Sequence, residues 1–141
     1  VTGVQTCALR SCTFYPIGVV HSPVKDPVHP DLLKDVEAKI EIKPFYELGL
    51  DDLREGQEII IVFRFHRSSS FHFHVHPKGD LARPLKGVFA TCSPRRPNFL
   101  GVSRCVLKRK EGCCLHVSGL DAIDGTPVLD IKPFALYGGR G

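Results

Sequence analysis

Short strand-like segments, separated by turn residues, recur along this chain at intervals of about ten residues and limit its fold more than any other feature. The segment EIIIVFRFH (58–66) is rich in β-branched and aromatic residues, and EAKIEIKP (37–44) alternates polar and apolar residues as a half-buried strand does. Similar segments are YPIGVV (15–20), GVFAT (87–91), SRCVLKRKEG (103–112), CCLHVSGL (113–120) and VLDIKPF (128–134). YELGLDDLREGQ (46–57) indicates one or two helical turns. The pattern predicts an all-β barrel or sandwich.

The chain has the size of one domain. Its 141 residues can bury enough surface to fold without a disulfide or a metal. The longest apolar run, IIIVF (59–63), is far shorter than a membrane span, and no signal-peptide pattern opens the chain, so we expect a cytoplasmic protein. Residues 1–13 lack clear periodicity and resemble a translated sequencing adapter. We therefore expect a non-native tail at 1–13, a domain at 14–134 and a C-terminal tail at 135–141.

Of the six cysteines, the four within the expected domain are expected to be free thiols. Cys7 and Cys12 fall in the expected tail, and the adjacent Cys113 and Cys114 fit no paired zinc spacing. Cys92 has basic neighbours, but no partner histidine lies near it in the sequence, which argues against a catalytic nucleophile.

Positive charge is concentrated in the second half of the chain. Residues 78–110 contain nine lysines and arginines and one acid, Asp80, a net charge of +8, so the rest of the chain sums to −4 of the total of +4. This asymmetry indicates a polyanion as partner, with nucleic acid the leading candidate. The alternative is a solvated basic face that binds nothing.

The sequence SPRRPN (93–98) frames two adjacent arginines with prolines. Arg95 and Arg96 carry planar forks of N–H donors that suit phosphate or carboxylate, and Asn98 adds an amide that can read a base edge. A surface turn with incidental charge is the alternative, and the basic surroundings favour the binding role.

A second candidate region is LDAIDGTPVLDIKP (120–133). Asp124 and Gly125 form an Asp-Gly turn signal, which Thr126 and Pro127 extend. Alone, such a string usually marks only a turn; together with SPRRPN it becomes more specific. Further polar residues near this turn are Asp121, Asp130 and Lys132.

The sequence HFHVH (72–76) is a rival signal. On a strand, His72, His74 and His76 would share one face, and a His-x-His pair can bind zinc or a similar ion. The simpler interpretation is a half-exposed strand with Phe71, Phe73 and Val75 directed inward. No acidic or cysteine ligand is recruited nearby, so we predict no metal site.

Seven motifs occur in an order that resembles the TsaA-like, or TrmO, family over about residues 14–134. They are IGVVHSPVKDP, EAKIEIKPFYELGLDDL, IIIVFRFHRS, VHPKGD, GVFATCSPRRPN, LGVS and SGLDAIDGTPVLDIKPF. The resemblance implies a compact, mainly antiparallel β-barrel, a homodimer, and a methyltransferase that uses S-adenosylmethionine. It further implies tRNA as substrate, bound by its anticodon arm and methylated on N6 of the threonylcarbamoyl-modified adenosine next to the anticodon.

The resemblance also implies roles for individual residues. Those expected at the methyl donor are His29, Pro30, Asp31, His66, Arg67, Cys92, Val102, Ser118, Gly119, Leu120 and Asp121. Those expected at the substrate are Arg95, Arg96, Asn98, Gly125, Thr126, Pro127 and Lys132. Methyl transfer needs alignment and the removal of one proton, for which Asp124 or Asp121 is the candidate base.

Four departures separate this chain from the family pattern. Cys92 stands where the family has arginine in FATRSP, and PNFLGVS replaces PNPIGLS, with changes at Phe99 and Val102. GQE (56–58) replaces FSH, and Val28-His29 replaces Arg-Gln. The alternatives to a methyltransferase are a basic RNA-binding barrel without activity and a metal enzyme that uses the three histidines of HFHVH.

Overall fold

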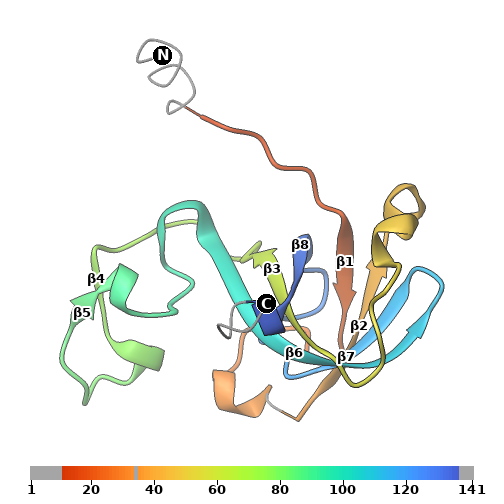
Figure 1. Cartoon of the computed structure of the whole chain (residues 1–141). Coiled ribbons are helices and arrows are strands. Elements are labelled where there is room, and N and C mark those ends of the chain that lie inside the picture. The colour runs from red at the N-terminus through yellow and green to blue at the C-terminus, as the bar shows by residue number, and fades with distance from the viewer. Residues whose placement is uncertain (1–10, 34, 137–141) are drawn as a thin grey trace.

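The computed structural model describes residues 11–33 and 35–136 of the chain (Figure 1). Six strands close into an antiparallel barrel in the order β1-β2-β7-β6-β3-β8, and two short strands form a separate small sheet. The barrel strands are β1 (Gly18–His21), β2 (Glu37–Ile42), β3 (Glu58–Arg64), β6 (Leu100–Glu111), β7 (Cys114–Ser118) and β8 (Pro127–Pro133). The small sheet pairs β4 (His74–Val75) with β5 (Lys86–Gly87). The predicted all-β barrel is confirmed.

The helical parts of the described residues are short 3₁₀ helices. They are η1 (Pro30–Leu32), η2 (Pro44–Leu50), η3 (Pro77–Gly79), η4 (Val88–Ala90), η5 (Pro97–Phe99) and η6 (Phe134–Leu136). Helix η2 confirms the helical turns predicted within 46–57. Within the described part of the chain, no helix is long and apolar enough to cross a membrane.

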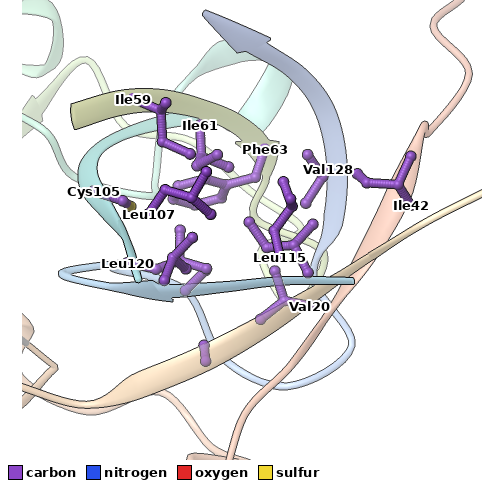
Figure 2. Close-up of a cluster of buried hydrophobic side chains, with 14 of the residues drawn as sticks. Val20, Ile42, Ile59, Ile61, Phe63, Cys105, Leu107, Leu115, Leu120 and Val128 are labelled. Atoms are coloured by element: carbon purple, nitrogen blue, oxygen red, sulfur yellow. The ribbon is translucent and has the colours of Figure 1, made fainter. Parts of the chain in front are cut away.

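The core fills the barrel with the inward-facing residues of each strand. Strand β2 buries every second residue, as its alternating sequence predicts, and β3 buries Ile59, Ile61 and Phe63 in the same way. Figure 2 shows these three side chains in one cluster with Leu107 of the neighbouring strand β6 and Leu115 of β7. Full burial of one such side chain stabilises the fold by about 1.5–3 kcal/mol.

A glycine in β6 makes room for the aromatic part of this core. Gly101 pairs with Phe63, and a Cβ atom at this position would lie 2.5 Å from the Phe63 ring and 2.8 Å from the Phe65 ring. The two rings pack edge to face, with centroids 5.2 Å apart. Only a residue without a side chain lets both rings lie against the β6 backbone.

The strand directions place three connections at the same end of the barrel, which we call the loop end. They are residues 22–36 between β1 and β2, 65–99 between β3 and β6, and 119–126 between β7 and β8. The opposite end, which we call the hairpin end, carries the β2–β3 connection and the tight turn between β6 and β7. The long connection 65–99 contains the β4–β5 sheet and projects beside the barrel (Figure 1).

Two predictions for the 65–99 connection are wrong. GVFAT (87–91) is not a strand, because β5 ends at Gly87 and Val88 begins η4, where the Thr91 hydroxyl donates a hydrogen bond to the Val88 carbonyl. The expected inward direction of Phe71 and Phe73 is also wrong, since they are 45% and 73% exposed. Both residues precede β4, which contains only His74 and Val75, and of the three residues expected to point inward only Val75 is buried.

The five cysteines within the described residues are free thiols, which confirms the expectation for Cys92, Cys105, Cys113 and Cys114. Cys7 lies outside the described residues. Cys105 is 1% exposed in the barrel core, and burial raises the pKa of its thiol to about 12, so it stays neutral at physiological pH.

Candidate functional site at the loop end

The loop end gathers nearly all of the predicted site residues. From 22–36 and 65–99 come His29, Pro30, Asp31, His66, Arg67, Cys92, Arg95, Arg96 and Asn98. From the end of β7 and the β7–β8 connection come Ser118, Gly119, Leu120, Asp121, Asp124, Gly125 and Thr126, with Pro127 as the first residue of β8. Val102 lies near this end on β6, where it is 64% exposed on the outer wall.

Lys132 does not join this group. Strand β8 runs from the loop end to the hairpin end, and Lys132 pairs with Ile60 near the end of that path. Its Nζ atom lies 3.0 Å from Asp130 Oδ2. The prediction that Lys132 lies on the substrate side of the same site therefore has no support from its position.

Asp124 ties the β7–β8 connection to the β1–β2 connection. The Ser22 backbone N–H donates to Asp124 Oδ1 at 2.9 Å, and Lys25 Nζ lies 2.9 Å from Oδ2. The Asp124 N–H in turn donates to the Val24 carbonyl. The Ser22 hydrogen bond and then the Lys25 ammonium lower the pKa of Asp124, so this carboxylate is a weak base.

The neighbouring turn is held equally firmly. Gly125 adopts a φ of +82°, which favours glycine, and its N–H donates to the Val20 carbonyl at 2.8 Å. The Thr126 hydroxyl donates to the Ile123 carbonyl at 2.7 Å, and Thr126 is 2% exposed. The Asp-Gly-Thr-Pro sequence thus shapes the turn, and its hydroxyl does not reach solvent.

His66 lies directly beside this turn. Its Nε2 atom is 3.6 Å from the position that a Cβ atom on Gly125 would occupy. Partial burial, followed by the charges of Arg67 and Arg64, lowers the pKa of His66. The imidazole is therefore neutral at pH 7 and can accept a proton or a hydrogen bond.

A second cluster joins all three connections around Asp121. His29 Nδ1 lies 3.5 Å from Asp31 Oδ2, and Lys78 Nζ, from η3, lies 3.2 Å from Asp31 Oδ1. The surrounding chain partly desolvates Asp121, and together with the Asp31 carboxylate this raises the pKa of Asp121, although the residue stays exposed. The Asp121 backbone is held to strand β6, because its N–H donates to the buried Ser103 hydroxyl.

The sequence did not single out Lys78, Ser103, Ser22 or Lys25 as site residues. Lys78 adopts a φ of 54° before Gly79, so the Lys-Gly pair within VHPKGD was the available signal for a sharp turn. The other three act through contacts with residues far away in the chain, which no local pattern reveals.

The two arginines of SPRRPN have different surroundings. Arg96 donates to the Thr91 carbonyl at 2.7 Å and to the Ser93 carbonyl at 3.4 Å, so its guanidinium braces the preceding turn. Arg95 is exposed, as are Cys92 and Asn98. Arg95 is therefore the arginine of this pair that faces solvent and can meet a ligand.

The histidines of HFHVH do not form a metal site in the structure. The ring Nδ1 of His76 is hydrogen-bonded to the Arg83 carbonyl at 2.8 Å, while His72 and His74 are exposed. Within residues 11–33 and 35–136, no group of three or more His, Cys, Asp or Glu side chains is arranged to hold a metal ion.

Two hollows of the surface lie at opposite ends of the barrel. A cavity of about 590 Å³ opens at the hairpin end, between η2 and β8, and includes Tyr46, Leu50 and Lys132. A shallower hollow of about 440 Å³ at the loop end includes Lys25 and Asp124. The size of the first does not make it the reaction site, since the titratable clusters described above lie at the other end.

Comparison with known families and proteins identifies relatives of this chain. The family model of the tRNA-methyltransferase O N-terminal domain matches residues 19–138. A probable S-adenosyl-L-methionine-binding protein of Pyrococcus abyssi is 38% identical over 125 residues, which cover 86% of this chain and 67% of that protein. A tRNA (adenine(37)-N6)-methyltransferase of Mus musculus is 36% identical over 128 residues, which cover 84% of this chain and 30% of that protein.

Solved structures agree with these matches. The crystal structure of TrmO from Pseudomonas aeruginosa superimposes with a TM-score of 0.69 at 32% sequence identity, covering 90% of this chain and 57% of the TrmO chain. This chain therefore spans little more than half of that protein, and about a third of the mouse relative.

The hydrogen bond and the ion pair of Asp124 predict how the stability of the fold depends on pH. Because folding lowers the pKa of Asp124, its contribution to stability is present above the unfolded-state value of about 3.9 and is lost as pH falls through the folded-state value. We expect Asp124→Asn to lower the free energy of unfolding at neutral pH, with the difference from wild type shrinking below pH ~4. Urea unfolding of both proteins across this pH range measures the difference in the free energy of unfolding.

Asp51→Asn, a change in an exposed aspartate at the hairpin end, is the control for the loss of one negative charge. A difference between wild type and Asp124→Asn that stays constant down to the most acid pH would contradict the role of the ionised carboxylate.

Proposed function

The chain belongs to the family of the tRNA-methyltransferase O N-terminal domain, and we propose that it methylates N6 of threonylcarbamoyl-modified adenosine beside the anticodon of tRNA, with S-adenosylmethionine as donor. The names of the mouse and Pyrococcus relatives support the reaction and the donor respectively. The observation that carries the proposal is the convergence of three connections at the loop end, where groups of both charges surround Asp121.

The charges of the Asp121 cluster suit the methyl donor. The amino-acid part of S-adenosylmethionine carries one ammonium and one carboxylate, and the cluster offers Asp31 for the first and Lys78 with His29 for the second. Val102, Cys92 and the Ser118–Leu120 segment complete the donor side of this proposal. When bound, the donor supplies an electrophilic methyl group on a sulfonium.

The chain's own contribution to the chemistry is positioning and proton removal. As N6 forms its bond to the methyl carbon, the carbon–sulfur bond breaks, and one proton must leave the nitrogen. Asp121 is the better acceptor of that proton, because its pKa is raised whereas that of Asp124 is lowered. Asp124 instead acts as a positioning residue that fixes the turn against His66.

Arg95 and Asn98 are exposed beside this end and form the substrate side of the proposal, with Arg96 holding their loop. The basic segment 78–110 would contact the phosphates of the anticodon arm. A homodimer located in the cytoplasm completes the proposal, as expected from the family resemblance.

A second candidate function is a basic RNA-binding barrel without methyl transfer. The observation in its favour is Cys92, which stands where the family pattern has an arginine and presents an exposed thiol in place of a cationic fork. Calorimetry with S-adenosylmethionine separates the two functions, because only the methyltransferase needs a donor site.

The direct test is a methyl-transfer assay with radiolabelled S-adenosylmethionine. We expect label in tRNA that carries the threonylcarbamoyl modification and none in unmodified tRNA, because the modification distinguishes the proposed substrate. Label in both tRNAs would overturn the proposed substrate, and label in neither, together with no donor binding, would favour the RNA-binding barrel.

The proton acceptor is tested by Asp121→Asn. We expect kcat to fall about 100-fold or more, because general-base catalysis contributes factors of this size. The wild-type rate should also rise as the pH passes through the pKa of Asp121. The pH–rate profile of the variant should lack this rise. A variant that only weakens donor binding, with full turnover at saturating donor, contradicts the role as base.

The exposed thiol is tested by Cys92→Arg. If Cys92 lies at the donor, a restored guanidinium should strengthen S-adenosylmethionine binding by roughly tenfold, the effect of one charge-assisted hydrogen bond. Cys92→Lys is the matched control, since it adds the charge without the planar fork. Calorimetry that finds equal affinity in all three proteins would place Cys92 away from the donor.

A further inference from the structure

The 65–99 connection forms a lobe beside the barrel, which we call the β4–β5 lobe (Figure 1). Its surface carries several large apolar side chains that the proposed reaction does not use. They are Phe71 (45% exposed), Phe73 (73%), Leu81 (80%), Leu85 (57%) and Phe89 (77%). Several exposed apolar residues on one connection, two of which are in contact, make this lobe a candidate interaction surface.

Two of these side chains form a fixed aromatic pair. The rings of Phe71 and Phe73 meet edge to face, with centroids 5.4 Å apart and planes at 88°. Their backbone is tied on both sides, since the Val88 N–H donates to the Phe73 carbonyl at 2.8 Å and the His72 N–H donates to the Arg95 carbonyl at 3.2 Å. The rings are therefore presented on an ordered backbone.

The lobe is strongly basic around this pair. Residues 65–99 contain six lysines and arginines and the single acid Asp80, a net charge of +5. Within the described residues, no ion pair engages Arg95 or Lys86, although Asp80 lies 3.5 Å from Arg83. The Arg95 backbone carbonyl accepts the hydrogen bond from the His72 N–H, which holds Arg95 beside the residue between the two rings. Lys86 pairs with Val75 in the small sheet.

This combination selects one kind of partner. Exposed aromatic rings among unpaired cations are how proteins hold single-stranded nucleic acid, because bases stack on the rings while phosphates meet the charges. A second copy of the chain is a poorer fit, since a symmetric contact through this face would bring two lobes of charge +5 together.

We propose that Phe71 and Phe73, flanked by Arg95 and Lys86, form a stacking platform for unpaired bases of RNA. This proposal rests on the proposed function for the identity of the RNA, and it adds the surface that holds the bases around the modified nucleotide. The Lys78–Asp31 ion pair connects the lobe to the β1–β2 connection at the loop end. An RNA strand bound by the platform would therefore contact the same 65–99 connection that supplies Arg95 and Asn98 to the site.

The test is RNA affinity, measured by fluorescence anisotropy for two probes: an anticodon-arm stem-loop and a blunt RNA duplex of equal length. We expect the Phe71→Ala/Phe73→Ala double variant to bind the stem-loop about tenfold more weakly, as stacking of a base on an aromatic ring predicts. Duplex affinity should not change, because paired bases are not free to stack. Phe45→Ala, which removes an 88% exposed ring at the hairpin end, is the matched control.

A Phe73→Trp variant should keep stem-loop affinity, which separates loss of stacking from damage to the lobe. Unchanged stem-loop affinity in the double variant overturns the platform, as does an equal loss for both probes. Sedimentation that finds the wild type dimeric and the double variant monomeric would make this face an interface between copies and would also overturn it.

These outcomes separate the platform from the proposed function. A double variant that keeps both full methyl transfer and stem-loop affinity would contradict the platform and leave the proposed function intact. A wild-type protein that binds neither the stem-loop nor S-adenosylmethionine would contradict the proposed function.

Discussion

The short seam between β1 and β8 is the contact on which the rest of this structure depends. It pairs only Gly18 with Val128 and Val19 with Pro127, whereas β3 and β6 pair along the whole of β3. Without the seam the six strands would be an open sheet with two unpaired edges, and the side chains of the core would face solvent. A backbone hydrogen bond of 2.8 Å from the Ile17 N–H to the Val128 carbonyl extends it at the hairpin end.

The same seam continues past the strands into the site. The Val20 N–H donates to the Thr126 carbonyl, and the Gly125 N–H donates back to the Val20 carbonyl. Asp124 then adds its bond to Ser22. The turn beside His66 thus continues the hydrogen bonding that joins β1 to β8. The same contacts therefore close the barrel and fix the geometry of the site.

The loop end also separates two carboxylates that look alike in the sequence. Asp124 receives a backbone N–H and an ammonium, which favour its charged form, while Asp121 is partly desolvated beside Asp31, which disfavours it. Environments that push two pKa values apart allow one carboxylate to hold structure and the other to exchange a proton.

Local sequence pattern predicted the elements better than it predicted their relations. The alternation in 37–44 located β2, because inward and outward residues of a half-exposed strand differ in polarity. The run in 58–66 located β3 through its β-branched and aromatic residues, which favour strands. The same logic was wrong for Phe73, which precedes β4 and is exposed, although Val75 in the same alternation is buried.

The candidate site was predictable only in part. Family motifs indicated most residues that the loop end gathers. Lys132 belongs to the same motif but lies near the opposite end of the barrel, because it is the sixth residue of β8, the strand that runs away from the turn. The opposite pKa shifts of Asp121 and Asp124 depend on Asp31, Lys78, Ser22 and Lys25, which come from distant parts of the chain. No window of sequence contains those neighbours.

The ends of the β4–β5 lobe meet at the barrel wall. Arg64 pairs with Leu100, and the next backbone hydrogen bond, 2.7 Å from the Phe65 N–H to the Phe99 carbonyl, closes the ladder before the chain departs. In topological terms the lobe is an insertion in a hairpin that is already complete. Its length and sequence can therefore change over evolution without shifting the register of a single barrel strand, so this fold can acquire new partners while inheriting its core unchanged.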